Sequence, residues 1–314
     1  MSTHWDELEP VHKERGHIVG DWYSLTGERS VTVGVNRITV PPGKWSTPLH
    51  VEGSEEEIFY VLGGSGISVQ YHDETLSAYE VGPGDCLVHL PLECAHTLQA
   101  GPDGLDVLAF GERHHPLGST RLPRAGVSWG LGAWTRTGEP EDHPWKREAE
   151  AGPPEVPELS PRPPSIVNVA DVEPVERLGE TVGFSSRHVS NAAGSLRSGM
   201  RHVTGVPGLL SVAPHCHSAE EEIFVVLGGE GTLLLWDGDE PSEQTLRAGT
   251  TVARPAGTRV AHSFASGDDP LVYLAYGTRD SRDVCWYPRS NKLFFRGLGV
   301  IARVERLDYW DGEE

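Results

Sequence analysis

The stretch that decides the fold is HCHSAEEEIFVVLGGEG, residues 215–231, because the chain contains two copies of it. Sliding the sequence by 165 residues places HVEGSEEEIFYVLGGSG, residues 50–66, on top of it. Between 33–66 and 198–231, 16 of the 34 positions are identical without a gap. A repeat of this length indicates an internal duplication, so we expect two domains that share one fold.

The duplication extends through most of the 314 residues. At a shift of 166 residues, AHTLQAG (95–101) matches AHSFASG (261–267). Between the copies, residues 137–165 contain eight prolines, which is typical of an extended, semi-rigid linker. We therefore predict a first domain over 1–136 and a second domain over 166–314, joined by this linker.

Each copy has the sequence pattern of β-strands. Ile67, Val69 and Tyr71 alternate with polar residues, as in a strand with one buried face. EIFYVL and EIFVVL are compact apolar runs that end at Gly63-Gly64 and Gly228-Gly229. Glycine adopts the positive φ angles that tight turns require, so we predict an all-β chain with a hairpin at each glycine pair.

Four residues of the second copy have the types and spacing of metal ligands. His215 and His217 are two residues apart, so on a strand both imidazoles face the same side. Glu222 opens the next apolar run, and His262 follows about 40 residues later, far enough to come from another strand. Three imidazoles and one carboxylate suit a first-row divalent ion such as Fe, Mn or Zn, and they leave coordination positions open for a substrate.

These motifs resemble those of the cupin superfamily. The first cupin motif appears as H-x-H-x4-E-x6-G over 215–229, and the second as G-x5-P-x-G-x4-H over 249–262. The second motif departs from the family by two extra residues before His262, and by Ala265 or Ser266 where an asparagine could stand. The resemblance covers both copies and implies a bicupin. Each domain is then a double-stranded β-helix barrel of jelly-roll type with the metal inside.

The first copy departs further from the family pattern. His50, Glu57 and His96 match three of the four candidate ligands, but Glu52 replaces the second histidine. Two carboxylates would make a harder site that favours Mn²⁺, Mg²⁺ or Zn²⁺. The alternative is a degenerate barrel that is retained for packing, and the sequence does not decide between the two.

Three other residues have a less certain role. Arg37 and His202 hold equivalent places 13 residues before the first ligand of each copy. They could hold an anionic substrate, although a surface position on a strand is the simpler interpretation. Cys216 lies between His215 and His217, so we predict that it faces away from the cavity. No CxxC pair occurs, and the four cysteines are predicted to be free thiols.

The net charge and the hydropathy pattern of the chain disfavour two classes of binding partner, nucleic acids and membranes. The net charge of −20 disfavours nucleic acid, and no apolar run reaches the length of a membrane span. The polar N-terminal segment lacks a signal-peptide pattern, so we predict a cytoplasmic protein that binds a small molecule, as a monomer or a homodimer.

Three functions are compatible with the sequence. The first is an iron-dependent oxidoreductase of dioxygenase type that acts on a small oxygenated molecule. The second is a non-redox metal-dependent isomerase, lyase or hydrolase that acts on a small acid or sugar. The third is a binding or storage protein without turnover. Of these three functions, the sequence favours the oxidoreductase, because the second copy contains all four candidate metal ligands.

Overall fold

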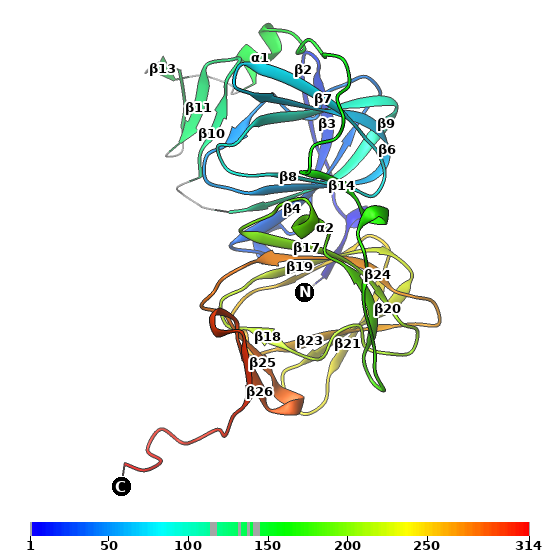
Figure 1. Cartoon of the computed structure of the whole chain (residues 1–314), viewed down its shortest axis with the longest axis vertical. Coiled ribbons are helices and arrows are strands. Elements are labelled where there is room, and N and C mark those ends of the chain that lie inside the picture. Colours follow the sequence, from blue (N-terminus) through cyan, green and yellow to red (C-terminus); the bar gives the residue numbers. More distant parts are fainter. Residues whose placement is uncertain (1, 114–117, 131–132, 137–138, 141–144, 314) are drawn as a thin grey trace.

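The computed structural model describes residues 2–113, 118–130, 133–136, 139–140 and 145–313 (Figure 1). Two β-barrels are stacked along the long axis of the molecule, with the first half of the chain forming one and the second half the other (Figure 1). The predicted all-β architecture is confirmed. Among the described residues, no helix is both long enough and apolar enough to cross a membrane.

The first half of the chain contributes thirteen described strands. They are β1 (Ser2–His4), β2 (Val11–Arg15), β3 (Ile18–Ser24), β4 (Val33–Val40), β5 (Val51–Glu52), β6 (Glu57–His72), β7 (Thr75–Val81), β8 (Asp85–His89), β9 (Ala95–Glu112), β10 (Thr120–Leu122), β11 (Val127–Gly130), β12 (Ala133–Arg136) and β13 (Glu139–Pro140). The sheet of the first barrel has the order β14-β8-β6-β9-β4-β3-β2, with β7 paired to β6, and its edge strand β14 (Ile166–Asn168) comes from the second half of the chain.

The second half follows the same plan. Its strands are β14 (Ile166–Asn168), β15 (Val175–Leu178), β16 (Gly183–Arg187), β17 (Ser198–Gly205), β18 (Cys216–His217), β19 (Glu222–Gly228), β20 (Glu230–Trp236), β21 (Ser242–Arg247), β22 (Thr250–Arg254), β23 (Ala261–Ser266), β24 (Val272–Thr278), β25 (Val284–Tyr287), β26 (Lys292–Phe295) and β27 (Val300–Arg303). The short helices are α1 (Lys146–Glu150), α2 (Val189–Ala192) and the 3-10 turns Trp5–Glu7, Gly27–Arg29, Val169–Asp171, Pro288–Ser290 and Arg296–Leu298.

The prediction of a hairpin at each Gly-Gly pair is wrong. Strands β19 and β20 flank Gly229 but lie in different sheets, because β19 pairs with β22 and β24 whereas β20 pairs with β21 and β23. Gly229 has φ +75°, and a Cβ there would lie 2.2 Å from the carbonyl oxygen of Pro270. The glycine therefore allows the chain to turn a barrel corner, passing from one sheet to the other. Gly64 does the same in the first barrel, within the long strand β6.

The two barrels exchange their first strands. Strand β1 pairs antiparallel with β22 of the second barrel, and β14 pairs antiparallel with β8 of the first. An apolar core also joins the barrels, and Ile223 and Val225 of β19 belong to it. The alternate residues Phe224 and Val226 belong to the core inside the second barrel. Glu222 begins this inward-facing series, which places its carboxylate inside the barrel.

The described part of the linker packs against the first barrel. Trp145 lies against Trp22, with 5.7 Å between ring centroids. Further along, Arg162 pairs with the buried Asp85 at 2.7 Å. Residues 137–138 and 141–144 of the predicted linker lie outside the described residues. The linker is therefore held on the barrel surface from 145 onward.

Candidate metal centre

The second barrel brings the four predicted ligands together. Strand β18, its flanking residue His215, the start of β19 and strand β23 supply the four side chains. The three imidazole Nε2 atoms lie 3.7 Å (His215), 3.4 Å (His217) and 3.2 Å (His262) from Glu222 Oε2. The backbones of His215 and His262 are paired by two hydrogen bonds, so neighbouring strands fix their positions.

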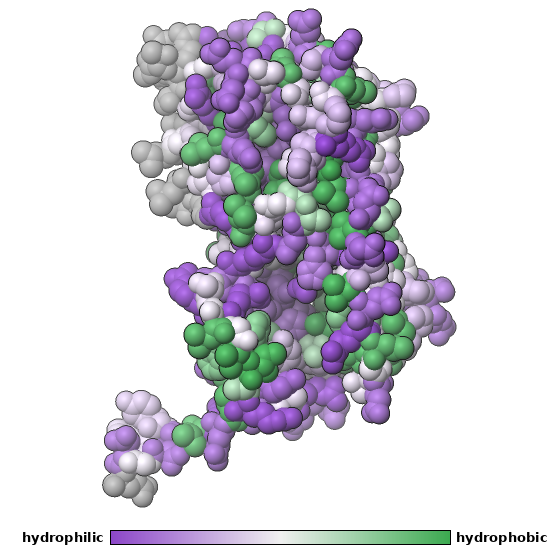
Figure 2. Space-filling model, in the orientation of Figure 1, coloured by the Kyte–Doolittle hydropathy of each residue, from purple (hydrophilic) through white to green (hydrophobic). Residues whose placement is uncertain are grey.

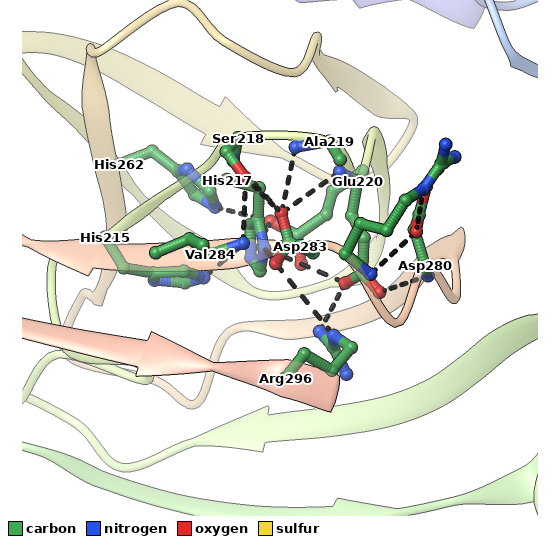
Figure 3. Close-up of polar contacts among 12 residues, drawn as sticks. His215, His217, Ser218, Ala219, Glu220, His262, Asp280, Asp283, Val284 and Arg296 are labelled. Atoms are coloured by element: carbon green, nitrogen blue, oxygen red, sulfur yellow. Dashed lines mark hydrogen bonds and ion pairs between the residues drawn. The ribbon is translucent and has the colours of Figure 1, made fainter. Parts of the chain in front are cut away.

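Hydrogen bonds orient two of the imidazoles. His215 Nδ1 donates to the carbonyl oxygen of Ala213 at 2.8 Å, and His217 Nδ1 donates to Asp283 Oδ2 at 2.7 Å (Figure 3). Each bond orients the ring so that its Nε2 atom lies on the side of Glu222. Asp283 is buried and also accepts from the backbone N–H groups of 218–220, so it fixes the loop between the ligands as well as one ring.

The charges of the centre follow from burial and from proximity. Burial lowers the pKa of His215 to about 3, and the nearby imidazoles add to this effect. Burial would also lower the pKa of His217, but the charge of Glu222 and the bond to Asp283 raise it to about 11. The same imidazoles hold the pKa of Glu222 well below its usual range, although burial opposes them. These shifts favour a protonated His217 beside an ionised Glu222, and a cation that binds would displace the extra proton of His217.

The donor set fits a divalent metal ion. His217 Nε2, Glu222 Oε2 and His262 Nε2 are buried and make no hydrogen bond to any described residue. Buried polar atoms without partners are costly, and coordination of a cation would satisfy all three together. Three imidazoles and a carboxylate are ligands that first-row divalent ions accept.

A cavity of about 420 Å³ adjoins this centre. Its wall is formed by ligand side chains, aromatic rings and cationic side chains, among them His215, His217, Glu222, Arg201, Tyr273 and Tyr287. The face of the second barrel in Figure 2 is hollowed, and hydrophilic residues line the hollow. The cavity gives a small polar molecule access to the ligand atoms.

Two residues near the centre have contacts that the sequence did not predict. Glu220 is buried on the cavity wall, accepts from the backbone N–H of Asp280 at 2.8 Å and pairs with Arg296 (Figure 3). Burial raises the pKa of Glu220 to about 7. Asp283 lies 66 residues from His217, and no motif in the sequence connects the two.

Arg37 and His202 do not line this cavity. Arg37 pairs with Asp106 at 2.7 Å and lies over the ring of Trp5. His202 lies against Tyr60 of the first barrel. Cys216 is buried and is absent from the cavity wall, as predicted, whereas Cys285 belongs to that wall.

In the first barrel, His50, Glu57 and His96 form one cluster of possible ligand atoms, as His215, Glu222 and His262 do in the second. His96 Nε2 and His50 Nε2 lie 3.0 and 3.4 Å from Glu57 Oε2. Glu52 falls outside this cluster, because its Oε2 accepts from the hydroxyl of Thr120 at 2.7 Å and its Oε1 lies 3.8 Å from His50. Burial and the charge of Glu57 raise the pKa of Glu52 to about 7, which weakens it as a ligand at neutral pH.

Comparisons with known proteins agree with this fold. Residues 201–277 match the family model described as Cupin domain. The structure of oxalate decarboxylase from Bacillus subtilis at pH 4.6 has a TM-score of 0.59 and 17% identity, over 88% of this chain and 75% of that one. A structure from work on the Mn(II) centres of the same enzyme has a TM-score of 0.60 and 16% identity, over 90% and 78%. No curated protein matches the chain by sequence.

The second barrel is of the cupin class, because residues 201–277 match the cupin domain family. The chain as a whole has the fold of a bicupin, with two barrels in one polypeptide. This confirms the resemblance drawn from the two motifs. At 16–17% identity, the likeness to the two structures concerns the fold alone.

Proposed function

We propose that the second barrel is a divalent-metal enzyme that performs a non-redox reaction of lyase type, such as decarboxylation, on a small carboxylic acid. The observation that carries this proposal is the convergence of three imidazoles on Glu222 beside a 420 Å³ cavity, whose wall includes His215, His217 and Glu222. The similar solved structures are of a decarboxylase with Mn(II) centres, which supports this alternative better than the dioxygenase hypothesis. The dioxygenase hypothesis is unconfirmed.

The ligand residues and Asp283 would have different roles in this reaction. A divalent ion bound by His215, His217, Glu222 and His262 would supply Lewis acidity towards a substrate oxygen. Asp283 keeps His217 in the tautomer that can bind the ion. Loss of carbon dioxide breaks one C–C bond and leaves the electron pair on the remaining carbon, which then takes up a proton. This stoichiometry consumes neither oxidant nor reductant.

Anaerobic assay of the metal-loaded protein tests the proposal. The purified chain is analysed for metal, reloaded separately with Mn²⁺, Fe²⁺ or Zn²⁺, and incubated with a panel of small carboxylic acids. We expect carbon dioxide release without oxygen, and its loss in His217→Ala. The matched control His72→Ala changes an exposed histidine of the first barrel and should keep full activity. Product formation that requires stoichiometric oxygen uptake would instead support the dioxygenase.

Three further properties belong to the same proposal. The ion is a first-row divalent cation, with Mn²⁺ the first to test because the similar enzyme has Mn(II) centres. The first barrel binds a cation more weakly than the second, since Glu52 is engaged with Thr120. A cytoplasmic location and a homodimer remain predictions from the sequence.

A further inference from the structure

Arg201 points into the second barrel on the same wall as the metal centre. On strand β17, Met200 belongs to the core between the barrels and His202 lies against Tyr60 of the first barrel. Side chains alternate along a strand, so Arg201 faces the other way, into the barrel. Consistent with this, Arg201 lines the cavity together with Tyr273.

The register of the sheet fixes how Arg201 stands relative to Glu222. Arg201 is paired with Ala275 of β24, which is paired with Phe224 of β19. Two residues further along β24, Gly277 is paired with Gly199 of β17 on one side and with Glu222 of β19 on the other. Arg201 and Glu222 are therefore two strand spacings and two residues along the strand apart, roughly 12 Å at the backbone. Between Arg201 and Glu222, the intervening strand places the small residues Ala275 and Gly277 on the cavity wall, and Tyr273, Tyr276 and Thr278 of the same strand also line the cavity.

Arg201 is free to bind a ligand. The two other arginines of the cavity wall are engaged: Arg279 donates to the carbonyl oxygen of Ser195 at 2.9 Å, and Arg296 pairs with Glu220. The side chain of Arg201 makes no hydrogen bond or ion pair with any residue in the described ranges, and its backbone is paired within the sheet. An uncommitted guanidinium facing a polar cavity is suited to a carboxylate, which it can bind through two parallel hydrogen bonds.

The first barrel provides an internal comparison. Its residue equivalent to Arg201 is Asn36, in the same register, paired with Ala109, which is paired with Phe59. The two copies therefore share the alanine and the phenylalanine of this row, but differ in the charge of its third residue, which is Asn36 in the first barrel and Arg201 in the second. The cation is present only in the barrel that has the three-histidine set, so the two features go together.

We propose that Arg201 binds a second anionic group of the substrate, which makes the substrate class a short dicarboxylic acid. This inference rests on the proposed function for the position of the first carboxylate, at the metal centre. The charges agree. A divalent cation with Glu222 would leave one net positive charge, Arg201 and Arg279 each add one on the cavity wall, and Arg296 is paired with Glu220. This positive excess suits a dianion, within a chain whose net charge is −20.

Binding measurements on the metal-loaded protein test the inference without depending on turnover. Titration calorimetry compares malonate, succinate and glutarate with propionate and butyrate, using wild type, Arg201→Asn, Arg201→Lys and the control Arg177→Asn, which changes an exposed residue of β15. We expect Arg201→Asn to weaken dicarboxylate binding by about 10–100-fold, with monocarboxylate affinity and metal content unchanged. Arg201→Lys should recover part of the loss, and Arg177→Asn should behave as wild type.

The outcomes separate this inference from the proposed function. Arginine-dependent dicarboxylate binding without any product supports the dicarboxylate site and counts against the lyase. Turnover of monocarboxylic acids that is equal in wild type and Arg201→Asn supports the lyase and overturns the dicarboxylate site. Failure of wild type to prefer any dicarboxylate over its monocarboxylate counterpart also overturns it.

Discussion

Glu56 and Glu221 occupy equivalent positions in the two copies, and each accepts hydrogen bonds from the backbone of the opposite barrel. Glu56 Oε2 accepts from the N–H of Leu196 at 2.9 Å, and Glu221 Oε2 accepts from the N–H of Thr32 at 2.7 Å. Both carboxylates are buried. The barrels are therefore joined by two symmetry-related polar contacts in addition to the shared apolar core.

Removal of either carboxylate should weaken the junction between the barrels. Glu56→Ala leaves several buried donors of 195–198 without an acceptor, so we expect a loss of roughly 3 kcal/mol in the free energy of unfolding. Glu221→Ala should have a similar but smaller effect, because fewer donors depend on it. Urea denaturation measures both, with the exposed Glu176→Ala as control. A loss no larger than that of the control would contradict the structural role.

The contribution of Glu56 should depend on pH in a defined direction. Burial alone would raise its pKa, but hydrogen bonds from Ser195, Ser198 and two backbone N–H groups hold the pKa below its usual 4.5. A lowered folded-state pKa stabilises the protein above the unfolded-state pKa, and this stabilisation is lost as pH falls through the folded-state value. Wild type should thus exceed Glu56→Gln in stability at pH 7, and the difference should shrink steadily below about pH 4.5. A difference that stays constant from pH 7 to pH 3 would argue against an ionised Glu56.

Asp283 should control metal affinity without touching the metal. Asp283→Asn keeps the shape of the side chain but weakens its hold on His217 Nδ1, so we expect a loss of affinity of about 10–100-fold. Competition with a chelator measures this. The control Asp280→Asn changes a carboxylate whose side-chain partner is the exposed Arg282, and should leave the affinity unchanged. Equal affinity in wild type and Asp283→Asn would show that the His217 ring is held by packing alone.

The EEE run at 220–222 shows how far the sequence could predict the site. The spacing to Gly229 identified Glu222 as the ligand, and alternation along the strand placed it on the inner face with Phe224. The function of Glu221 could not be predicted, because its partners belong to the other barrel. Such a contact depends on how two barrels dock, and no local pattern encodes that.

Long-range pairing accounts for what else the sequence did not predict. The exchange of β1 and β14 between barrels joins short segments whose composition is unremarkable. The position of Arg201 on the cavity wall could not be predicted, because it depends on the register that pairs Arg201 with Ala275. The glycine pairs were recognised as sites of positive φ, but the choice between hairpin and barrel corner depends on which strands pair, and that is set by tertiary structure.

The first barrel should gain a metal site from one substitution. Glu52→His restores the third imidazole and removes a carboxyl that is engaged with Thr120, while His50, Glu57 and His96 already converge. Elemental analysis should show about one tightly bound ion per chain in wild type and about two in Glu52→His. The control Glu80→His places a histidine on an exposed position of β7 and should add none. Two tightly bound ions in wild type would mean that Glu52 leaves Thr120 and serves as a ligand, because metal binding would then outweigh the hydrogen bond.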